Sequence, residues 1–203
     1  MLIGLTGLSC AGKNYAGSLL EARGWRVLDV DKLGWTVLDN AHAEIARRWG
    51  HAVVHNDGRV DRKALGRIVF GNAAELAALE AIVHPRVDQH IETWLSAYPH
   101  SDAVINAALL HKTQVWPRLD AVIVIRAPFL LRLFRAKKRD KLPLYMIIRR
   151  FLNQKSFVRH FYETQFFEKK TDIYSIDNGI FRGNFERKLD KTLMCIHEVC
   201  ERW

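Results

Sequence analysis

The fold is decided by the amino-terminal stretch Leu2-Ile3-Gly4-Leu5-Thr6-Gly7-Leu8-Ser9-Cys10-Ala11-Gly12-Lys13-Asn14. An apolar run ends at Gly7, a short loop follows, and Lys13 opens an amphipathic segment, which is the order of a strand, a phosphate loop and a helix. Glycine at the two ends of the loop lets consecutive backbone N–H groups turn inward around phosphate oxygens. The positive end of the following helix and the Lys13 side chain add attraction for the β and γ phosphates. The stretch therefore predicts a nucleotide-phosphate site.

The loop matches the pattern G-x-x-x-x-G-K-[ST] at every defined position except the last. Asn14 stands where a hydroxyl residue normally binds magnesium. An amide oxygen is also a hard ligand, so we predict that Asn14 contacts Mg²⁺ directly or through water. The alternative is a glycine-rich turn without a ligand. The residues predicted to bind ATP at the loop are Gly7, Cys10, Ala11, Gly12, Lys13, Asn14 and Tyr15.

Composition fits an ordinary globular protein, with 49% hydrophobic and 26% charged residues among 203. No apolar run approaches the roughly 18 residues that span a bilayer. The three cysteines are an odd number and cannot all pair, as is usual in a reducing compartment. We therefore expect a cytoplasmic protein with no membrane partner. Cys10 is either a small tolerated loop residue or a thiol activated by the helix end.

The positive charge is concentrated in one segment. Residues 132–159 contain ten basic residues and one acidic residue, a net charge of +9 that equals the excess of the whole chain. A phosphate loop lies elsewhere, so this distribution favours a nucleotide kinase with a basic lid over a general nucleic-acid binder. Binding of nucleic acid through this segment is the alternative, and we expect no nucleic-acid partner.

Apolar runs predict four further strands, and helical periodicity fills most of the remaining chain. The predicted strands are Trp25–Val30, Ala103–Asn106, Ala121–Arg126 and Ile173–Ile176. The predicted helices are Tyr15–Arg23, Arg62–Phe70 capped by Asp61, Ala73–Ile82 capped by Asn72, one that starts at His84-Pro85, Leu144–Leu152, and Asn184–Arg202.

These elements predict an α/β phosphate-loop fold with three layers (α/β/α) and a five-stranded parallel sheet. The helical stretch between the second and third strands is too long for a simple crossover and indicates an inserted substrate domain. We expect one kinase unit over residues 1–203. Its predicted parts are a core of residues 1–30, 101–131 and 170–203, a helical acceptor domain of residues 31–100, and a basic lid of residues 132–169.

Two carboxylates end the second predicted strand. In open α/β sheets the carboxyl ends of the strands line the ligand crevice. Alternation along a strand would place Asp29 and Asp31 on the same side, one toward the substrate and the other toward magnesium or a structural partner. The competing interpretation is that Asp31 caps the following helix.

Several blocks in order resemble the dephospho-coenzyme A kinase family, over nearly the whole chain. The matching stretches are residues 3–13, Val30-Asp31-Lys32, Asp57-Gly58-Arg59-Val60-Asp61-Arg62-Lys63-Ala64-Leu65-Gly66-Arg67-Ile68-Val69-Phe70, Leu79-Glu80-Ala81-Ile82-Val83-His84-Pro85, Arg135 with Lys138-Arg139-Asp140, and Ile176-Asp177-Asn178-Gly179.

The resemblance implies transfer of the ATP γ-phosphoryl group to the ribose 3′-hydroxyl of dephospho-coenzyme A, giving coenzyme A and ADP. It implies that Asp31 orients or deprotonates that hydroxyl, and that Thr6 lies near the transferring group beside Lys13. Arg62 and His84 are expected to bind the acceptor, and Arg135 and Arg139 to close over ATP. The implied ligands are ATP, Mg²⁺ and dephospho-coenzyme A; the protein is expected to be a monomer or a weak homo-oligomer.

The chain departs from the family pattern at three polar positions. Asn14 replaces Ser or Thr, Asn106 stands where many members have Asp, and Glu168-Lys169-Lys170 lacks an arginine. These departures raise a second hypothesis, a homologue that binds nucleotide or coenzyme A without turnover. A kinase for another small acceptor is a further alternative. The remaining histidines lack metal-ligand spacing, so we expect no zinc site.

Overall fold

The computed structural model describes residues 1–152 and 172–200. The chain forms two compact units. Met1–Leu28 and His100–Trp203 form the first, which we call the nucleotide unit, and Asp29–Pro99 form the second, which we call the helical unit. The predicted lid segment at Glu168-Lys169-Lys170 lies outside the described residues.

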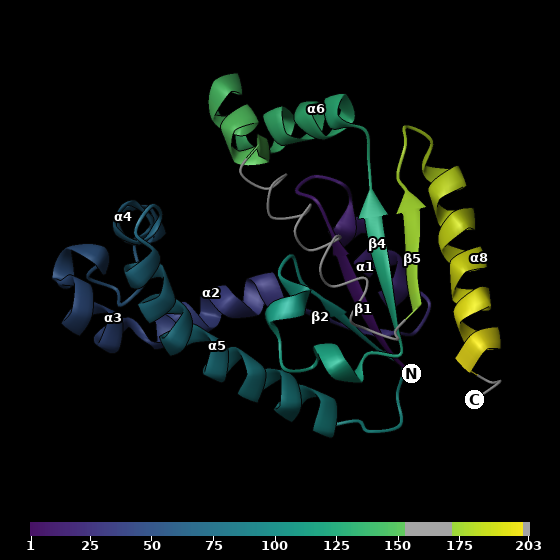
Figure 1. Ribbon diagram of the computed structural model, residues 1–203, viewed down its shortest axis with the longest axis horizontal. Coiled ribbons are helices and arrows are strands. Elements are labelled where there is room, and N and C mark those ends of the chain that lie inside the picture. The colour runs from purple at the N-terminus through teal and green to yellow at the C-terminus, as the bar shows by residue number, and fades with distance from the viewer. Residues whose placement is uncertain (153–171, 201–203) are drawn as a thin grey trace. The chain divides into compact units, whose positions relative to one another are not determined.

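Five strands form the sheet at the centre of the nucleotide unit. They are β1 (Leu2–Gly7), β2 (Arg26–Asp29), β3 (Ala103–Asn106), β4 (Ala121–Arg126) and β5 (Asp172–Asp177). Their order across the sheet is β2-β3-β1-β4-β5 (Figure 1). β1 pairs in parallel with β3 and β4, and β4 pairs in parallel with β5. The α/β fold with a five-stranded parallel sheet that the sequence predicts is confirmed.

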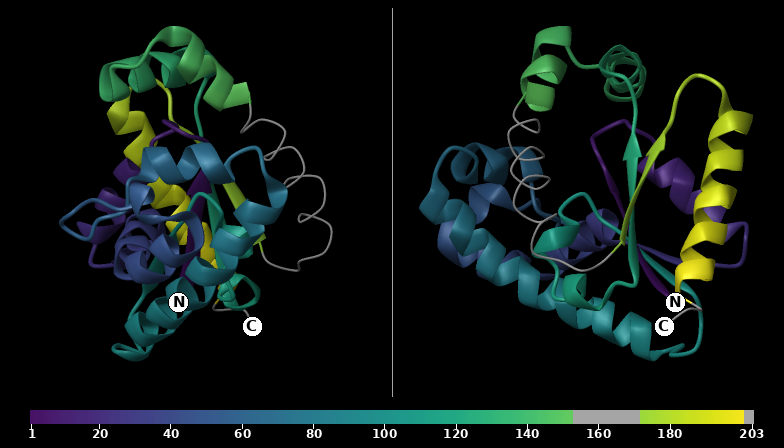
Figure 2. Two further views of the ribbon diagram at one scale, coloured as in Figure 1. Left: turned by 90° about the vertical axis from the view of Figure 1, so that its left-hand side faces the viewer. Right: turned by 45° about the vertical axis from the view of Figure 1, so that its right-hand side comes forward.

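Two helices, α1 (Lys13–Glu21) and α8 (Arg182–Cys200), pack on one face of this sheet (Figure 2). Alternate residues of each strand point to this face, because successive side chains of a strand point to opposite sides. Ile123 and Ile125 of β4 join Leu20 of α1 and Phe185 of α8 in one buried apolar cluster. This core fixes the start of α1, where the phosphate loop ends.

The opposite face of β1 is covered by the connection after β3, which includes two short 3-10 helices, η2 (Leu110–Lys112) and η3 (Trp116–Arg118). Gly4 faces this side, and a Cβ there would lie 2.8 Å from Cδ1 of Leu119 and would also collide with Leu110. Both leucines are buried. The small residue in β1 therefore lets the connection after β3 pack directly on the strand.

Beyond the carboxyl end of β4 the chain forms α6 (Phe129–Asp140), and residues 144–152 are also helical, as predicted. Figure 1 and the right-hand view of Figure 2 show α6 beyond the arrowhead of β4. Ala136 of α6 packs with Ile147 and Phe151 in a small buried cluster that also contacts Cys10 of the phosphate loop. The start of the predicted lid therefore packs on the loop.

The helical unit has its own elements and its own core. The elements are α2 (Val30–Asn40), α3 (His42–Trp49), η1 (His51–Val53), α4 (Arg62–Val69) and α5 (Ala73–Ser96). Buried residues of the core include Ile45, Val53 and Leu65. Asp61 caps α4 and Asn72 caps α5, each accepting hydrogen bonds from two backbone N–H groups, so both predicted caps are confirmed.

Two sequence predictions about this unit are wrong. The first is that Asp31 lies on a strand beside Asp29. The strand ends at Asp29, whose carboxylate accepts from the Lys32 backbone N–H at 3.1 Å as the cap of α2, so Asp31 is in the first helical turn. The cap satisfies an N–H that has no helical partner, and this ends the strand one residue before the predicted end at Val30.

The second is that Pro85 starts a helix, because it lies inside α5, which continues from Ala73 to Ser96. Proline normally interrupts a helix because it lacks an N–H and its ring crowds the preceding turn. Here Pro85 is exposed, and so is Ala81, whose carbonyl lacks its helical N–H donor because of the proline. The helix therefore passes through the proline.

Candidate active site

The phosphate loop, residues 8–12, joins β1 to α1 at the carboxyl edge of the sheet. Gly12 caps α1 with a φ of 109°, and a Cβ there would collide with the side-chain amide of Asn178. A Cβ at Gly7 would collide with the Ile125 carbonyl oxygen. Cys10 holds a φ of 60°, which is unfavourable for a residue with a Cβ. The glycines are thus required by close approach as well as by backbone conformation.

Three consecutive carbonyl groups of the loop, those of residues 9–11, accept hydrogen bonds from side chains of α6 and of the segment after β5. Arg132 Nε donates to the Ser9 carbonyl at 2.9 Å. Arg135 Nη1 donates to the carbonyls of Cys10 at 3.4 Å and Ala11 at 3.2 Å. Asn178 Nδ2 donates to the same Ala11 carbonyl at 2.7 Å. Sequence reasoning missed Arg132 and Asn178, since Arg132 counted only as lid charge and Asn178 only as part of a matching block.

Lys13 and Thr6 lie at the two ends of the loop, and both are nearly buried. Lys13 is 8% exposed in the first turn of α1, and Thr6 is 5% exposed near the end of β1. Thr6 Oγ1 donates to the Ala108 carbonyl at 3.4 Å. The fold therefore brings both predicted catalytic residues of this unit to the loop.

The two amide departures from the family pattern are neighbours. Asn106 Nδ2, at the end of β3, donates to Asn14 Oδ1 at 3.5 Å. Asn106 is 2% exposed, and its Oδ1 is buried without a hydrogen-bond partner among the described residues. Asn14 is exposed at the start of α1. Neutral amide oxygens beside a phosphate loop fit Mg²⁺, which keeps several waters and relies largely on substrate phosphates.

A cavity of about 320 Å³ lies between the ends of β4 and β5 and the start of α8. The cavity is lined by Arg126, Ala127, Pro128, Asp177, Gly179, Ile180, Phe181, Asn184, Phe185 and Lys188.

The side chain of Tyr15, a residue that the sequence predicts to bind ATP, contacts α8. Its ring lies 5.8 Å from that of Phe185 between centroids, and its hydroxyl donates to Glu186.

The two predicted lid arginines have different partners. Arg135 contacts the loop, whereas Arg139 Nε lies 2.6 Å from Asp140 Oδ1. Arg150 also donates to Asp140, so this carboxylate joins α6 to residues 144–152. The hydrogen bond from Arg139, followed by that from Arg150, lowers the pKa of Asp140. Burial lowers the pKa of Arg132, although an arginine stays charged at neutral pH.

The predicted acceptor residues lie in the helical unit, on exposed or half-buried positions. Arg62 Nη2 lies 3.0 Å from Asp39 Oδ2, and its guanidinium lies over the Trp35 ring at 4.7 Å. Asp31 is exposed, and His84 is half-buried on α5. Asp39 also accepts from the Val60 backbone at 3.0 Å, which ties the Asp57–Arg62 block to α2.

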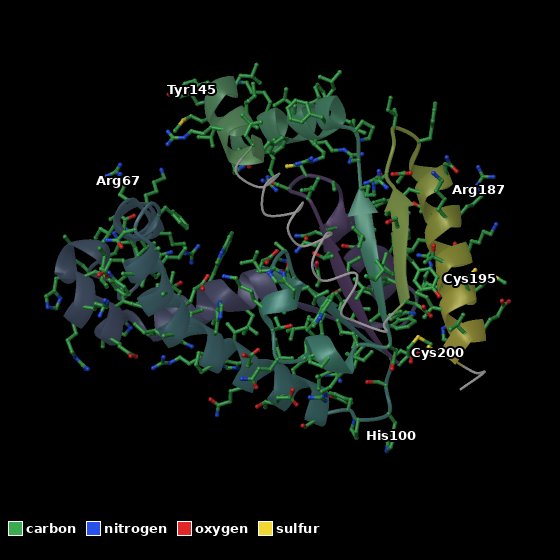
Figure 3. The ribbon with its side chains drawn as sticks, in the orientation of Figure 1. Arg67, His100, Tyr145, Arg187, Cys195 and Cys200 are labelled. Carbon is green, nitrogen blue, oxygen red and sulfur yellow. The ribbon has the colours of Figure 1, made fainter. Side chains whose placement is uncertain are left out.

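Within residues 1–152 and 172–200, no three His, Cys, Asp or Glu side chains gather as a metal site would require. In that same part of the chain, no helix is long and apolar enough to span a membrane. The three cysteines are free, and Figure 3 places Cys195 and Cys200 on α8, away from the phosphate loop.

The nucleotide unit has a parallel sheet and a phosphate loop that ends at a lysine, with arginines of a basic helix beside the loop. The chain also forms a separate helical unit. These features define a phosphate-loop kinase. The family model for dephospho-CoA kinase matches residues 1–160. The dephospho-CoA kinase of Treponema denticola is 33% identical over 199 residues, covering 93% of this chain and 87% of its own. That of Anaeromyxobacter dehalogenans is 41% identical over 147 residues, covering 70% of each chain.

A solved structure has a similar fold. The crystal structure of TT1252 from Thermus thermophilus has a TM-score of 0.76 and 30% identity, over 96% of both chains. The chain belongs to the dephospho-CoA kinase family. It phosphorylates the ribose 3′-hydroxyl of dephospho-coenzyme A with ATP, the last step of coenzyme A biosynthesis. The alternative of a non-catalytic homologue gains no support from these relatives.

Proposed function

We propose that the phosphate loop binds the ATP triphosphate and that Asp31 presents the acceptor hydroxyl to it. The observation that supports this proposal best is the orientation of the loop. Its carbonyls at residues 9–11 are held by side chains on one side, and the N–H groups of Cys10 and Gly12, which belong to two of these peptides, point the other way. The N–H of Ala11 donates to the Leu8 carbonyl at 3.0 Å and closes the loop on itself. Such an array of N–H groups at a helix start is a site for phosphate oxygens.

In this proposal Lys13 contacts the β and γ phosphates, and Thr6 lies near the transferred group. The loop residues Gly7, Cys10, Gly12, Asn14 and Tyr15 contribute mainly backbone N–H groups, because the Tyr15 side chain is engaged with α8. Ala11 lines the site, and its N–H donates to the Leu8 carbonyl. The adenine base occupies the cavity between the ends of β4 and β5, against Phe181.

Mg²⁺ would be held by the phosphates, with Asn14 and its partner Asn106 supplying amide oxygens directly or through water. When bound, the ion would neutralise charge between the phosphates. Asn14 and Asn106 carry no charge of their own. The protein's contribution at this corner is therefore to orient water and phosphate.

Arg139 of α6 would approach ATP when the lid closes, and Arg135 would act at the loop. Closure excludes water, which competes with the ribose hydroxyl as phosphoryl acceptor. Arg139 is exposed and paired with Asp140, so it can exchange one anionic partner for another. The lid assignment of residues 132–169 stays a prediction.

Asp29–Pro99 would serve as the acceptor domain, with Arg62 and His84 contacting dephospho-coenzyme A. Arg62 suits an anionic group of the acceptor because its guanidinium is exposed and already pairs with a carboxylate. Asp31 would orient the 3′-hydroxyl or take its proton; a loose transition state requires little proton abstraction early. We also propose a monomer or weak homo-oligomer that works in the cytoplasm without a nucleic-acid partner.

The test is ADP release from the purified protein with Mg-ATP, with and without dephospho-coenzyme A, and identification of coenzyme A by mass. We expect ADP release to depend on the acceptor and to match coenzyme A formation. ADP release that ignores the acceptor would indicate hydrolysis instead, and binding of both substrates without product would contradict the proposed catalytic roles.

A further inference from the structure

Arg132 lies behind the phosphate loop, on a helix that starts more than one hundred residues after it. Its Nε–H donates to the Ser9 carbonyl at 2.9 Å, the shortest of the three contacts from α6 to the loop carbonyls. Arg135 is three residues further along the same helix face and bonds the next two carbonyls. Together the two guanidinium groups cover consecutive carbonyls of residues 9–11.

The carbonyls of this loop matter because each peptide group fixes its N–H and its C=O in opposite directions. N–H groups that face phosphate require carbonyls that face away, and an unsatisfied buried carbonyl costs about 1–3 kcal/mol. A cation that binds those carbonyls therefore favours the phosphate-binding arrangement over one with a peptide turned around.

Burial of the Arg132 charge is energetically unfavourable, so a purely structural role does not explain it. It is 6% exposed, its Nη2 is buried without a hydrogen-bond partner, and no ion pair joins it to an acid of the described residues. Its guanidinium lies over the Phe151 ring at 4.5 Å. A buried charge without a carboxylate weakens a fold more often than it strengthens one. Its well-formed contacts are the loop carbonyl and the ring that holds it in place.

Asn178 completes the arrangement from the other side. Arg135 Nη2 donates to Asn178 Oδ1 at 3.4 Å and to the Gly179 carbonyl at 3.0 Å, while Asn178 Nδ2 donates to the Ala11 carbonyl. Asn178 is 4% exposed and fills the space that a side chain at Gly12 would need. The loop is thus held from both α6 and the segment after β5.

From these contacts we infer that Arg132 is a positioning residue for the phosphate loop, acting with Arg135 and Asn178 to turn the N–H groups of Cys10 and Gly12 toward the triphosphate. The inference rests on the proposed placement of ATP. It gives Arg135 a role through the loop, because its donors already serve loop and Asn178 oxygens. It also couples the base of the lid to the affinity for phosphate.

The test is binding of ATP and of adenosine, by calorimetry, to the full chain carrying Arg132→Met. Methionine keeps the contact with Phe151 but cannot donate. We expect ATP affinity to fall about 10-fold, consistent with a lost charge-assisted hydrogen bond, while adenosine affinity stays at the wild-type value. Arg132→Lys, which retains a donor, should recover part of the ATP affinity. Lys138→Met removes the same charge from an exposed position of the same helix and should change ATP affinity less than about twofold.

A second readout does not depend on ATP. In the ligand-free protein, Arg132→Met should speed hydrogen exchange of the amides of residues 9–12, and Lys138→Met should not. An equal loss of ATP affinity in Arg132→Met and Lys138→Met would indicate a general effect of positive charge and would contradict the positioning role. Unchanged exchange at the loop would overturn the inference. If the wild-type chain did not bind ATP, the proposed function would fail, and the exchange experiment would still decide the role of Arg132.

Discussion

The two compact units hold their candidate site residues in opposite ways. In the nucleotide unit the phosphate loop contributes backbone groups, and the side chains at its two ends, Lys13 and Thr6, are nearly buried. In the helical unit Asp31 is exposed and the Arg62 side chain is 44% exposed. The difference teaches that phosphate binding depends on the fold itself, whereas acceptor recognition depends on side chains that can change while the fold remains.

The largest effect is expected from Gly12→Ala, which tests whether the phosphate site is inseparable from its packing. The added Cβ would collide with Asn178 and break its bond to the Ala11 carbonyl. We expect ATP affinity to fall at least about 100-fold and stability to fall by about 2–3 kcal/mol, since a strained backbone and a lost buried hydrogen bond add. Calorimetry with ATP and urea unfolding measure the two quantities.

Gly24→Ala is the matched control, because Gly24 also has a positive φ of 87° but open space around its Cβ position. It should cost about 1 kcal/mol of stability from backbone strain and leave ATP affinity unchanged. If both variants lost ATP affinity equally, packing around Gly12 would not be the cause.

Asp31→Asn tests the other side of the comparison, an exposed side chain that we propose acts on the acceptor hydroxyl. We expect kcat to fall about 100-fold, which is typical of a lost proton acceptor or orienting group. The ATP dissociation constant and the melting temperature should stay at their wild-type values, because Asp31 is exposed in the first turn of α2. Steady-state kinetics and calorimetry provide the readouts.

Asp29→Asn is the control for this prediction, because asparagine caps a helix as well as aspartate does. It should keep the cap of α2 and most of the turnover. Loss of ATP binding in Asp31→Asn would indicate that Asp31 contributes to nucleotide or metal binding rather than to acceptor chemistry.

Arg62→Ala should affect acceptor binding alone. The KM for dephospho-coenzyme A should rise about 10-fold, as expected for a lost contact between a guanidinium and an anion, with the KM for ATP unchanged. Arg59→Ala is the matched control, because Arg59 is in the same block, 73% exposed, and paired with its neighbour Asp57. A similar rise in both variants would indicate a nonspecific effect of positive charge.

The contrast between the units also explains what the sequence could predict. The phosphate loop was predictable because its chemistry requires particular residues at fixed local spacing, and the strand before it and the helix after it follow from apolar periodicity. The caps of α4 and α5 were predictable for a similar reason, because Asp61 and Asn72 are each followed directly by a segment with helical periodicity. Local patterns therefore sufficed for most elements.

What local patterns could not predict depends on contacts between distant segments or on competing local effects. The contact of Arg132 with the loop joins residues 123 positions apart, and its sequence signal is merely one more positive charge. The Asn14–Asn106 bond similarly spans 92 positions. Asp29 and Pro85 show competing local effects: a cap ended the strand early, and an exposed position let a helix pass through proline.

The smallest expected effect compares one carboxylate from each unit, Asp140 and Asp57, in which hydrogen bonds from arginines lower the pKa. The Asp140 side chain is 15% exposed and joins α6 to residues 144–152, whereas Asp57 is 47% exposed and pairs within its own turn. Because the folded pKa of Asp140 is lowered, its stabilisation is complete above the unfolded pKa of about 3.9 and is lost as the pH falls through the folded value. Asp140→Asn should therefore lower the free energy of unfolding by about 1 kcal/mol near neutral pH, with the difference from wild type shrinking below about pH 4.

Urea unfolding across this pH range provides the measurement. Asp57→Asn is the control and should show a smaller difference at every pH, because solvent screens its ion pair. Equal differences for the two variants would mean that burial of the ion pair does not set its contribution to stability.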